Sequence, residues 1–332
     1  MYLKWLITVY AVLVCFVVIV IVFSCTGAAI FRKRRKFRQE AQSTIFVMLP
    51  CYRDDECPVT LDSLFSKAKY PERISVGVCV QNKEGDVECP GKNYKNNKKV
   101  RTIVLSNENA KGPCYARFLI STLYRDEKYV LSVDCHTNFV QDWDTLCIEM
   151  LNECSTPKKS VLTTHPPQQY KNPSVTRTTH ICKGKFNKDT VAFSSIEVAA
   201  QKKNMKTPFV GWGFIFMHGN ALKEVPLDPY LDFMFEGEEL LYAIRLWTSG
   251  YDLYSPRISV CTHAYGRTKQ PSVYIDVKDW SEKQKEAHNK LNKIMNGEIV
   301  KCYGPGKNRT VKQYLKFAKI DLTKKTIGEH CI

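Results

Sequence analysis

The sequence predicts an α/β fold in which helices flank a largely parallel sheet. Short apolar, β-branched runs alternate with segments whose apolar residues recur at helical spacing. A turn signal at Lys111, Gly112 and Pro113 separates the apolar run at 101–106 from the helical segment at 115–123. With 332 residues, of which 44% are hydrophobic and 25% charged, the chain can also bury a full core. We therefore expect one globular domain over residues 43–324, with a short tail at 325–332.

The N-terminal segment predicts a membrane anchor. Residues 5–31 contain no charged side chain and are long enough to cross about 30 Å of hydrocarbon as a helix. We expect a tail at 1–4, a transmembrane helix at 5–31 and a basic juxtamembrane linker at 32–42. A cleaved signal peptide remains open as the alternative, because small residues lie near the end of the apolar run.

Charge around this segment predicts which side the domain occupies. The block 32–38 (RKRRKFR) follows the apolar run, whereas only Lys4 precedes it. The positive-inside rule therefore places the domain on the cytosolic side, with the Golgi or endoplasmic-reticulum lumen as the alternative. Fourteen irregularly spaced cysteines and one glycosylation sequon, beginning at Asn308, leave that choice open. The net charge of +16 comes without a nucleic-acid-binding motif, so we expect no nucleic-acid partner.

The first half of the domain predicts a β-α-β series. Apolar, β-branched runs indicate buried strands at 43–50, 74–81, 101–106, 129–134 and 160–164. Helices are predicted where apolar residues recur at helical spacing, in segments that include 61–68, 115–123 and 143–154. Such a series is typical of open, nucleotide-binding α/β sheets.

The second half is more mixed. Runs at 191–197, 209–217 and 258–263 indicate strands, and we expect Trp212 to be a packed aromatic residue in the second of them. A helix is predicted over 236–250, where Gly250 ends it, and a polar surface helix over 279–296. We expect the two halves to share a cleft.

Three residues form a candidate metal site. Asp134 and His136 follow an apolar run at positions i and i+2, so on a strand end their side chains project to the same side, and His263 closes another apolar run. Carboxylate oxygen favours Mg²⁺ or Mn²⁺, and imidazole nitrogen moves the preference toward Mn²⁺. The alternative is that Asp134 is a strand-end turn residue and both histidines are ordinary, partly buried side chains.

The carboxyl ends of parallel strands should gather further ligand-binding residues. Tyr52, Arg53 and Gln81 end two of the predicted strands, and Arg117 lies on the helix after Gly112. We predict that these side chains, together with Asp134, bind a nucleotide and its diphosphate.

Two acids are candidates for a catalytic role. Glu238 and Glu239 follow Gly237 at the start of a predicted helix. A glutamate there could act at a reacting carbon or accept a proton, although acids in a first helical turn also complement the helix dipole. His165, which precedes two prolines, stays outside the predicted site.

Several motifs occur in a familiar order. The segments IFVMLPCYRDD, VGVCVQ, GPCYARF, YVLSVDCH, LTTHPP, GWGFIFM, EGEELLYAI and CTHAYGR resemble those of the hydroxyproline-polypeptide N-acetylglucosaminyltransferases. That family includes cytosolic enzymes that modify a ubiquitin-ligase subunit and mucin-type relatives in trypanosomatids. The resemblance runs over residues 43–324.

The resemblance implies a GT-A type fold with a Rossmann-like mixed sheet. It implies transfer of N-acetylglucosamine from UDP-N-acetylglucosamine, with retention at the anomeric carbon, to a hydroxyl of hydroxyproline, serine or threonine in a polypeptide. It also implies Mn²⁺, or Mg²⁺, on Asp134, His136 and His263, with Arg267 near the diphosphate. Cys135 stands where the family has serine, and we expect it to be a bystander.

Other functions remain possible from the sequence. Transfer of N-acetylgalactosamine or galactose, or transfer to a glycan, would need only a few pocket changes. A catalytically silent nucleotide- or carbohydrate-binding protein could use the same fold. A zinc hydrolase could use the same aspartate and histidines, but the chain lacks an H-E-x-x-H helix.

Overall fold

The computed structural model describes residues 43–169, 173–187, 190–266 and 270–331. The predicted anchor and basic linker lie outside these residues, as does Arg267. Within the described ranges, none of the helices combines the length and the apolar character that a bilayer crossing requires.

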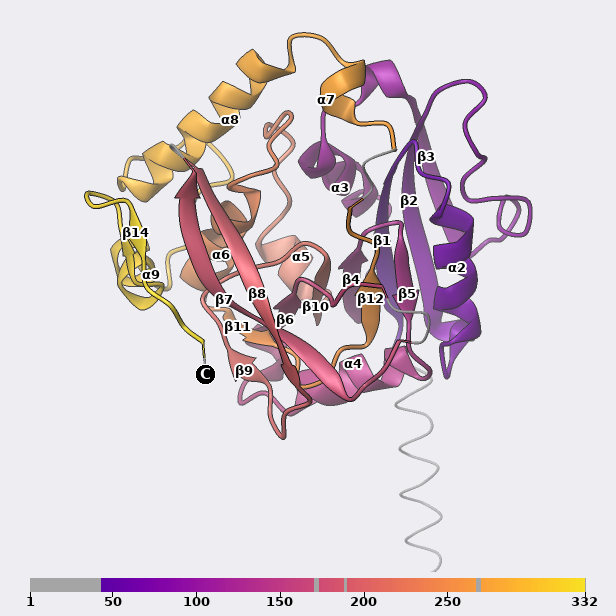
Figure 1. The fold of residues 1–332 in the computed structure, drawn as a ribbon, viewed down its shortest axis with the longest axis horizontal. Coiled ribbons are helices and arrows are strands. Elements are labelled where there is room, and N and C mark those ends of the chain that lie inside the picture. The colour runs from indigo at the N-terminus through magenta and orange to yellow at the C-terminus, as the bar shows by residue number, and fades with distance from the viewer. Residues whose placement is uncertain (1–42, 170–172, 188–189, 267–269, 332) are drawn as a thin grey trace, which may run out of the picture. The chain divides into compact units, whose positions relative to one another are not determined.

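An eight-stranded sheet forms the centre of the domain (Figure 1), in the order β3-β2-β1-β4-β10-β6-β11-β9. Its first four strands are parallel, as the sequence predicts: β3 (Val100–Ser106), β2 (Ile74–Asn82), β1 (Ile45–Tyr52) and β4 (Tyr129–Val133). Their carboxyl ends therefore lie at one edge of the sheet.

The remaining strands make the sheet mixed. β10 (Phe214–His218) runs antiparallel to both β4 and β6 (Ser160–Thr164), and beyond them lie β11 (Asp252–Ser255) and β9 (Met205–Lys206). The strand predicted over 209–217 begins only at Phe214, so the placement of Trp212 in a strand was wrong. The chain turns just before it, where the Phe214 N–H donates to the Gly211 carbonyl at 3.3 Å, and a Cβ on Gly213 would lie 2.7 Å from Pro166.

Both faces of the sheet are buried. Along β1, Phe46 and Met48 join one core cluster, whereas Ile45, Val47 and Leu49 join the other. The first cluster includes residues of α3 (Pro113–Ser121), α6 (Glu238–Thr248), α8 (Trp280–Met295) and α9 (Val311–Phe317), and the second those of α2 (Cys57–Ser66) and α4 (Trp143–Asn152). Burial on two faces explains why this strand is an unbroken apolar run.

Smaller elements surround the sheet. A long hairpin of β7 (Arg177–Asn187) and β8 (Thr190–Ala199) lies across one side of it (Figure 1), and β5 (Thr137–Phe139) pairs with β12 (Cys261–His263). The sequence did not predict β7, whose apolar residues are interrupted by threonine and lysine, and only the last half of the run 258–263 is a strand. The other elements are α5 (Asn220–Glu224), α7 (Val273–Asp276), β13 (Ile320–Asp321), β14 (Thr326–Ile327) and 3₁₀ turns at Pro71–Arg73, Asn107–Asn109 and Pro157–Lys159.

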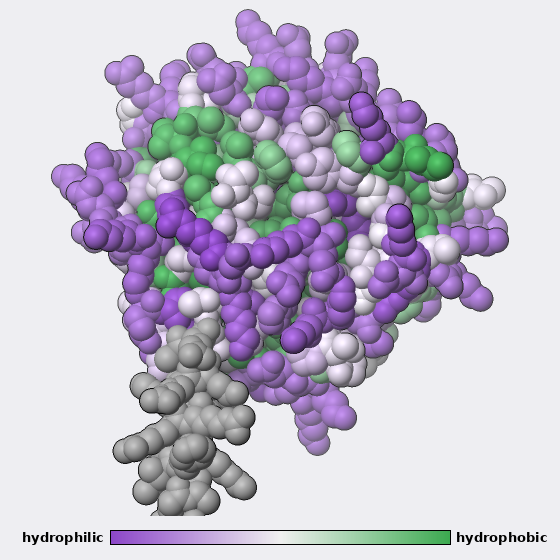
Figure 2. Space-filling view, turned by 180° about the vertical axis from the view of Figure 1, so that it is seen from behind, coloured by the Kyte–Doolittle hydropathy of each residue, from purple (hydrophilic) through white to green (hydrophobic). Residues whose placement is uncertain are grey.

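The surface is strongly polar. Hydrophilic side chains cover much of the face opposite to that of Figure 1, and apolar side chains gather in separate patches between them (Figure 2).

Two disulfides cross-link the domain. Cys57, at the start of α2, pairs with Cys89 in the loop after β2, and Cys182 in β7 pairs with Cys331 near the end of the chain. The Cα–Cα distances of 5.8 and 4.8 Å lie within the usual range. The second bridge closes a sequence separation of 149 residues and so removes much conformational freedom from the unfolded chain.

We expect removal of the longer bridge to destabilise the domain. In the double variant Cys182→Ala/Cys331→Ala, the free energy of unfolding should fall by about 2–5 kcal/mol, because the unfolded state regains loop entropy. Urea unfolding without reductant measures this difference. Cys302→Ala, which removes an exposed unpaired thiol, is the control and should stay within about 0.5 kcal/mol of the wild type. Equal stabilities of all three proteins would contradict the role of the bridge.

Candidate active site

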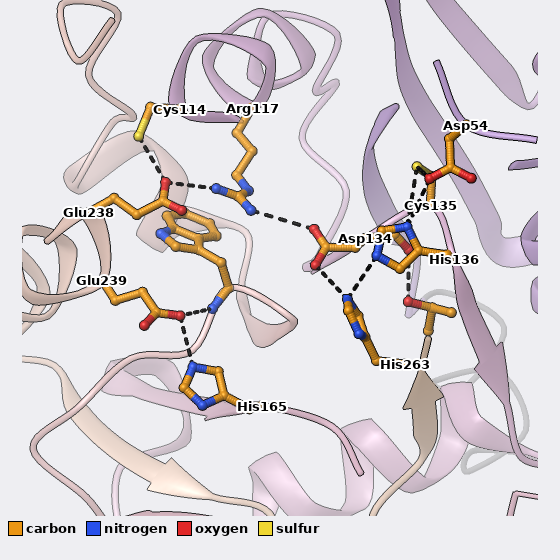
Figure 3. Close-up of polar contacts among 12 residues, drawn as sticks. Asp54, Cys114, Arg117, Asp134, Cys135, His136, His165, Glu238, Glu239 and His263 are labelled. Carbon is orange, nitrogen blue, oxygen red and sulfur yellow. Dashed lines mark hydrogen bonds and ion pairs between the residues drawn. The ribbon is translucent and has the colours of Figure 1, made fainter. Parts of the chain in front are cut away.

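Asp134, His136 and His263 come together at the carboxyl edge of the sheet (Figure 3). His263 Nε2 lies 3.0 Å from Asp134 Oδ2 and 2.9 Å from His136 Nε2. One ligand atom from each residue fits within a group no wider than 4.8 Å. The structure thus brings the three predicted metal ligands to one point.

Strand pairing explains this convergence. Asp134 follows the last residue of β4, and the chain then turns directly into β5. Because β12 pairs with β5, His263 lies opposite Thr137, and the Ala264 N–H donates to the His136 carbonyl at 3.1 Å. Residues 127 positions apart in the chain therefore meet side by side.

The donor set fits a divalent cation. His136 donates from Nδ1 to Asp54 Oδ2 at 2.9 Å, which leaves Nε2 of a neutral ring as a lone pair facing the cluster. Two imidazole nitrogens and one carboxylate oxygen then point to the same place. Without a cation, two ring nitrogens 2.9 Å apart must share a proton. Oxygen and nitrogen donors in this combination suit Mn²⁺.

The electrostatics of the cluster agree with this interpretation. Burial alone would lower the pKa of His136, but the hydrogen bond to Asp54 and nearby negative charge raise it to about 10. Burial opposes the ionisation of Asp134, yet His263 and Arg117 hold its pKa well below the usual range. In the metal-free site, therefore, the His136 proton occupies the place that a cation would take.

Asp54 is a site residue that the sequence analysis missed. Its carboxylate is 2% exposed and also accepts a hydrogen bond from the Cys135 thiol at 3.1 Å. Cys135 points away from the cluster, and its thiol contacts the residue that orients His136; the expectation that Cys135 is a bystander stays a prediction. The signal lay in the sequence, because Asp54 directly follows the strand-end residues Tyr52 and Arg53.

Arg117 connects the cluster to the start of α6. Its buried guanidinium lies 2.8 Å from Glu238 Oε2 and 3.5 Å from Asp134 Oδ1, and it packs 4.5 Å above the ring of Trp212. Glu238 also accepts from the Cys114 thiol at 2.8 Å. Burial raises the pKa of Glu238 to about 7, although the Arg117 charge opposes this.

Two glycines place these side chains. Gly112 and Gly237 have φ near +86° and +89°, and each immediately precedes a helix, α3 and α6 respectively. A Cβ on Gly112 would lie 2.9 Å from the Phe233 Cα, so the backbones touch there. This close approach brings Arg117 of α3 and Glu238 of α6 within reach of each other.

Glu239 has different partners from Glu238. Its Oε1 accepts from the Trp212 N–H at 3.0 Å and lies 2.9 Å from His165 Nε2, whose Nδ1 lies 3.2 Å from the Ser195 hydroxyl. Burial lowers the pKa of His165, but the charge of Glu239 raises it overall. His165, which was not among the predicted site residues, thus lies beside a predicted catalytic residue.

A cleft of about 610 Å³ opens over these groups. The end of β4, α3 and α6 supply Asp134, Arg117 and Glu239 respectively, and six residues of β8 line another part of the cleft. The two halves of the domain do share a cleft, as the sequence predicts.

The remaining predicted residues lie at the ends of β1 and β2, where Tyr52 and Arg53 directly precede Asp54. Arg53 forms ion pairs with Asp86 and Asp276, both at 2.8 Å, and the Tyr52 hydroxyl donates to Asp276 at 2.6 Å. Gln81 is buried and donates to the Cys51 carbonyl, so it lies beneath the end of β1. The sequence offered no signal for Asp276, whose α7 is short and distant in the chain.

Known proteins give independent information on this chain. The family model described as Glycosyltransferase (GlcNAc) matches residues 44–96 and 90–324. The crystal structure of GalNAc-T7 with UDP, GalNAc and Mn²⁺ shares the fold, with 12% identity and a TM-score of 0.55 over 85% of this chain. The aligned part is 58% of that structure, so this chain spans less than two thirds of it.

Two further solved structures are similar at lower scores. The mannosyltransferase PcManGT from Pyrobaculum calidifontis, in complex with GDP-Man and Mn²⁺, has 11% identity and a TM-score of 0.45, over 68% of this chain and 58% of that one. S. aureus TarS 1-349 in complex with UDP-GlcNAc has 13% identity and a TM-score of 0.46, over 67% and 59%. No curated protein sequence matches. The fold is thus a mixed α/β, GT-A-like fold.

Asp54 should be required for tight cation binding. In Asp54→Asn, the affinity for Mn²⁺ should fall by roughly 10–100-fold, because an uncharged amide replaces the carboxylate that fixes the His136 ring and raises its basicity. Electron paramagnetic resonance of free Mn²⁺ measures this directly, without any reaction. Cys135→Ser keeps a donor to Asp54 and is the matched control, with affinity close to wild type. An Asp54→Asn protein that binds Mn²⁺ normally would contradict this role.

Glu238 should make stability depend on pH. Its pKa is raised in the folded state from 4.5 to about 7, so the folded protein binds more protons than the unfolded chain between these values. Stability from this group is present below pH 4.5 and is lost as the pH rises to about 7. Relative to wild type, Glu238→Gln should therefore gain roughly 2–3 kcal/mol between pH 5 and pH 8.

Urea unfolding with a metal chelator at both pH values measures this gain. A constant difference between the two proteins would show that Glu238 is ionised throughout, contrary to the prediction.

Proposed function

The chain belongs to the Glycosyltransferase (GlcNAc) family, and from this premise we propose that it is a metal-dependent retaining transferase. It moves N-acetylglucosamine from UDP-N-acetylglucosamine to a hydroxyl of a polypeptide. The observation that carries the proposal is the convergence of Asp134, His136 and His263 at a cleft that also contains Arg117.

The proposed cofactor is Mn²⁺, with Mg²⁺ as the alternative. GalNAc-T7, which shares the fold, was crystallised with UDP and Mn²⁺. In this chain Asp134, His136 and His263 would hold the ion, and Asp54 would fix the ring of His136. When bound, the ion supplies Lewis-acid stabilisation of the negative charge on the diphosphate leaving group.

Arg117 is positioned to act on the same charge. It lies 3.5 Å from Asp134, and its other side is neutralised by Glu238. A buried guanidinium stabilises a developing negative charge strongly, because little water competes for it. In this proposal Glu238 is a positioning residue, since it holds Arg117 against the Trp212 ring and does not reach the sugar.

The nucleotide binds along the ends of β1 and β2. Arg53 and Tyr52 lie one and two residues before Asp54, so this short segment extends from the cation site to the proposed base and ribose site. Asp86 and Asp276 hold the Arg53 side chain, and Gln81 supports the backbone from below. The predicted diphosphate contact of Arg267 remains part of the proposal.

Glu239 and His165 are proposed to orient the acceptor hydroxyl. Glu239 accepts hydrogen bonds from Trp212 and His165, which fixes its carboxylate and reduces its nucleophilicity. This favours same-face attack over a covalent intermediate on Glu239. In that route the acceptor oxygen bonds to the anomeric carbon as the bond to the diphosphate breaks, and the departing diphosphate takes the proton.

The β7–β8 hairpin favours a polypeptide acceptor. β8 pairs only with β7 among the described strands, and six of its residues line the cleft. An extended peptide can add to such a free strand edge through backbone hydrogen bonds, which places a hydroxyproline, serine or threonine hydroxyl in the cleft. A glycan acceptor would make no use of this edge.

Three other results of UDP-sugar assays would indicate functions different from the proposed one. Hydrolysis of UDP-N-acetylgalactosamine or UDP-galactose in preference to UDP-N-acetylglucosamine would change only the donor. Binding of UDP-sugars without hydrolysis or transfer would indicate a silent binding protein. Zinc-dependent hydrolysis without affinity for UDP would indicate a hydrolase.

We expect Asp134→Ala and His263→Ala to abolish Mn²⁺-dependent hydrolysis of UDP-N-acetylglucosamine, because each removes one of three ligands. Circular dichroism and thermal unfolding should show that both variants remain folded. Cys135→Ser is the control and should retain turnover. Undiminished hydrolysis in both alanine variants would overturn the metal assignment.

A further inference from the structure

The disulfides and the glycosylation sequon lead to an inference that is independent of the proposed activity. We propose that the domain matures in an oxidising compartment of the secretory route, and that Asn308 carries an N-linked glycan there. The basic block at 32–38 favours a cytosolic location of the domain. Two structural observations favour the secretory route instead.

The first observation is the cysteine pairing. Four cysteines, far apart in sequence, meet in two pairs, Cys57–Cys89 and Cys182–Cys331. Seven of the eight unpaired cysteines in the described part of the chain are buried, and Cys302 alone is exposed. Stable structural disulfides form in oxidising compartments and are rare in the reducing cytosol.

The position of the longer bridge supports a structural function. It ties the end of the chain to β7, and beside it the His330 N–H donates to the Cys182 carbonyl at 2.8 Å while the His330 carbonyl faces His180. The bridge thus belongs to a packed corner of the fold. Each bridge forms by loss of two electrons and two protons from a thiol pair, and a disulfide-carrying oxidoreductase accepts them.

The second observation is the setting of the sequon. Asn308, Arg309 and Thr310 lie at the end of the loop between α8 and α9, and both Asn308 and Thr310 are exposed. The Asn308 backbone N–H donates to the Thr248 carbonyl at 2.9 Å, which anchors the loop. Beside it the Asn308 side chain packs against Gly250, where a Cβ would lie 2.8 Å from Asn308 Nδ2.

A glycan at this position leaves the cleft open. Asn308 lies at the C-terminal end of α6, whereas Glu238 and Glu239 lie at its N-terminal end, roughly 15 Å away along the helix axis. In the transfer, the Asn308 amide nitrogen bonds to the first sugar of a lipid-linked oligosaccharide, loses a proton and displaces the lipid diphosphate.

The Thr310 hydroxyl belongs to the sequon and also caps a helix, and this second function determines which variants are suitable. It accepts from the Gln313 N–H and caps α9. Thr310→Ala would therefore confound loss of the sequon with loss of the cap. Thr310→Asp keeps a capping oxygen but destroys the sequon, and Thr310→Ser keeps both.

The test uses the full chain produced in cultured animal cells. Peptide N-glycosidase should increase the gel mobility of the wild type and of Thr310→Ser, and it should leave Asn308→Gln and Thr310→Asp unchanged. After acid quenching of the cells, alkylation in denaturant should block all thiols except the four paired cysteines, which become reactive to a maleimide only after reduction.

A wild type that is insensitive to the glycosidase overturns the glycan assignment, and alkylation of all four cysteines before reduction overturns the oxidising compartment. UDP-sugar hydrolysis by Asn308→Gln should equal that of the wild type. Because neither gel assay involves a donor sugar, failure here is distinguishable from failure of the proposed function.

Discussion

The ionic contacts of Arg117 hold the two sides of the candidate site together. Its guanidinium is buried between Glu238, from the second half of the chain, and Asp134, from the parallel half of the sheet. Removing one partner would leave a buried charge unpaired, which is costly in an interior. The Arg117 guanidinium is kept in place by the helix α3, by the left-handed Gly112 before that helix and by the Trp212 ring. The distance between Asp134, in the candidate metal site, and α6 is therefore fixed by the packing of the protein itself and does not require a bound ligand.

The parallel half of the fold was predictable because burial on two faces leaves a plain signal. Strands such as β1 and β2 are continuous apolar runs, and their order along the chain is that of a β-α-β series. The hairpin strand β7 carries lysines where it faces solvent, and its buried Thr178 and Thr179 donate hydrogen bonds to backbone carbonyls, so its sequence resembles a loop. Trp212 was misplaced because the apolar run continues through it, whereas a turn between Gly211 and Phe214 comes before the strand.

Among the site residues, those at the ends of strands could be predicted from the sequence. Asp134, His136 and His263 could be predicted because Asp134 and His263 end apolar runs and His136 follows Asp134 by two residues. His165 ends one as well, after β6, but its partner Glu239 lies on a helix 74 residues away, and no spacing rule joins them. Asp276 is further still from Arg53, at 223 residues, on a short helix without a pattern of its own. Contacts of this kind depend on tertiary packing, which a single sequence does not encode in local periodicity.

Glu238 and Glu239 show how adjacent identical residues acquire different properties. Successive side chains on a helix point about 100° apart, so one acid faces the interior beside Arg117 and the other faces the cleft beside His165. Burial raises the pKa of Glu238 to about 7 even with a guanidinium against it. A carboxyl that titrates near neutrality changes the charge available to Arg117. When it is protonated, more of the Arg117 field acts on Asp134 and on any anion in the cleft; when it is ionised, that field is partly neutralised. The helix start therefore sets the positive potential on the side of the cleft where a diphosphate would lie.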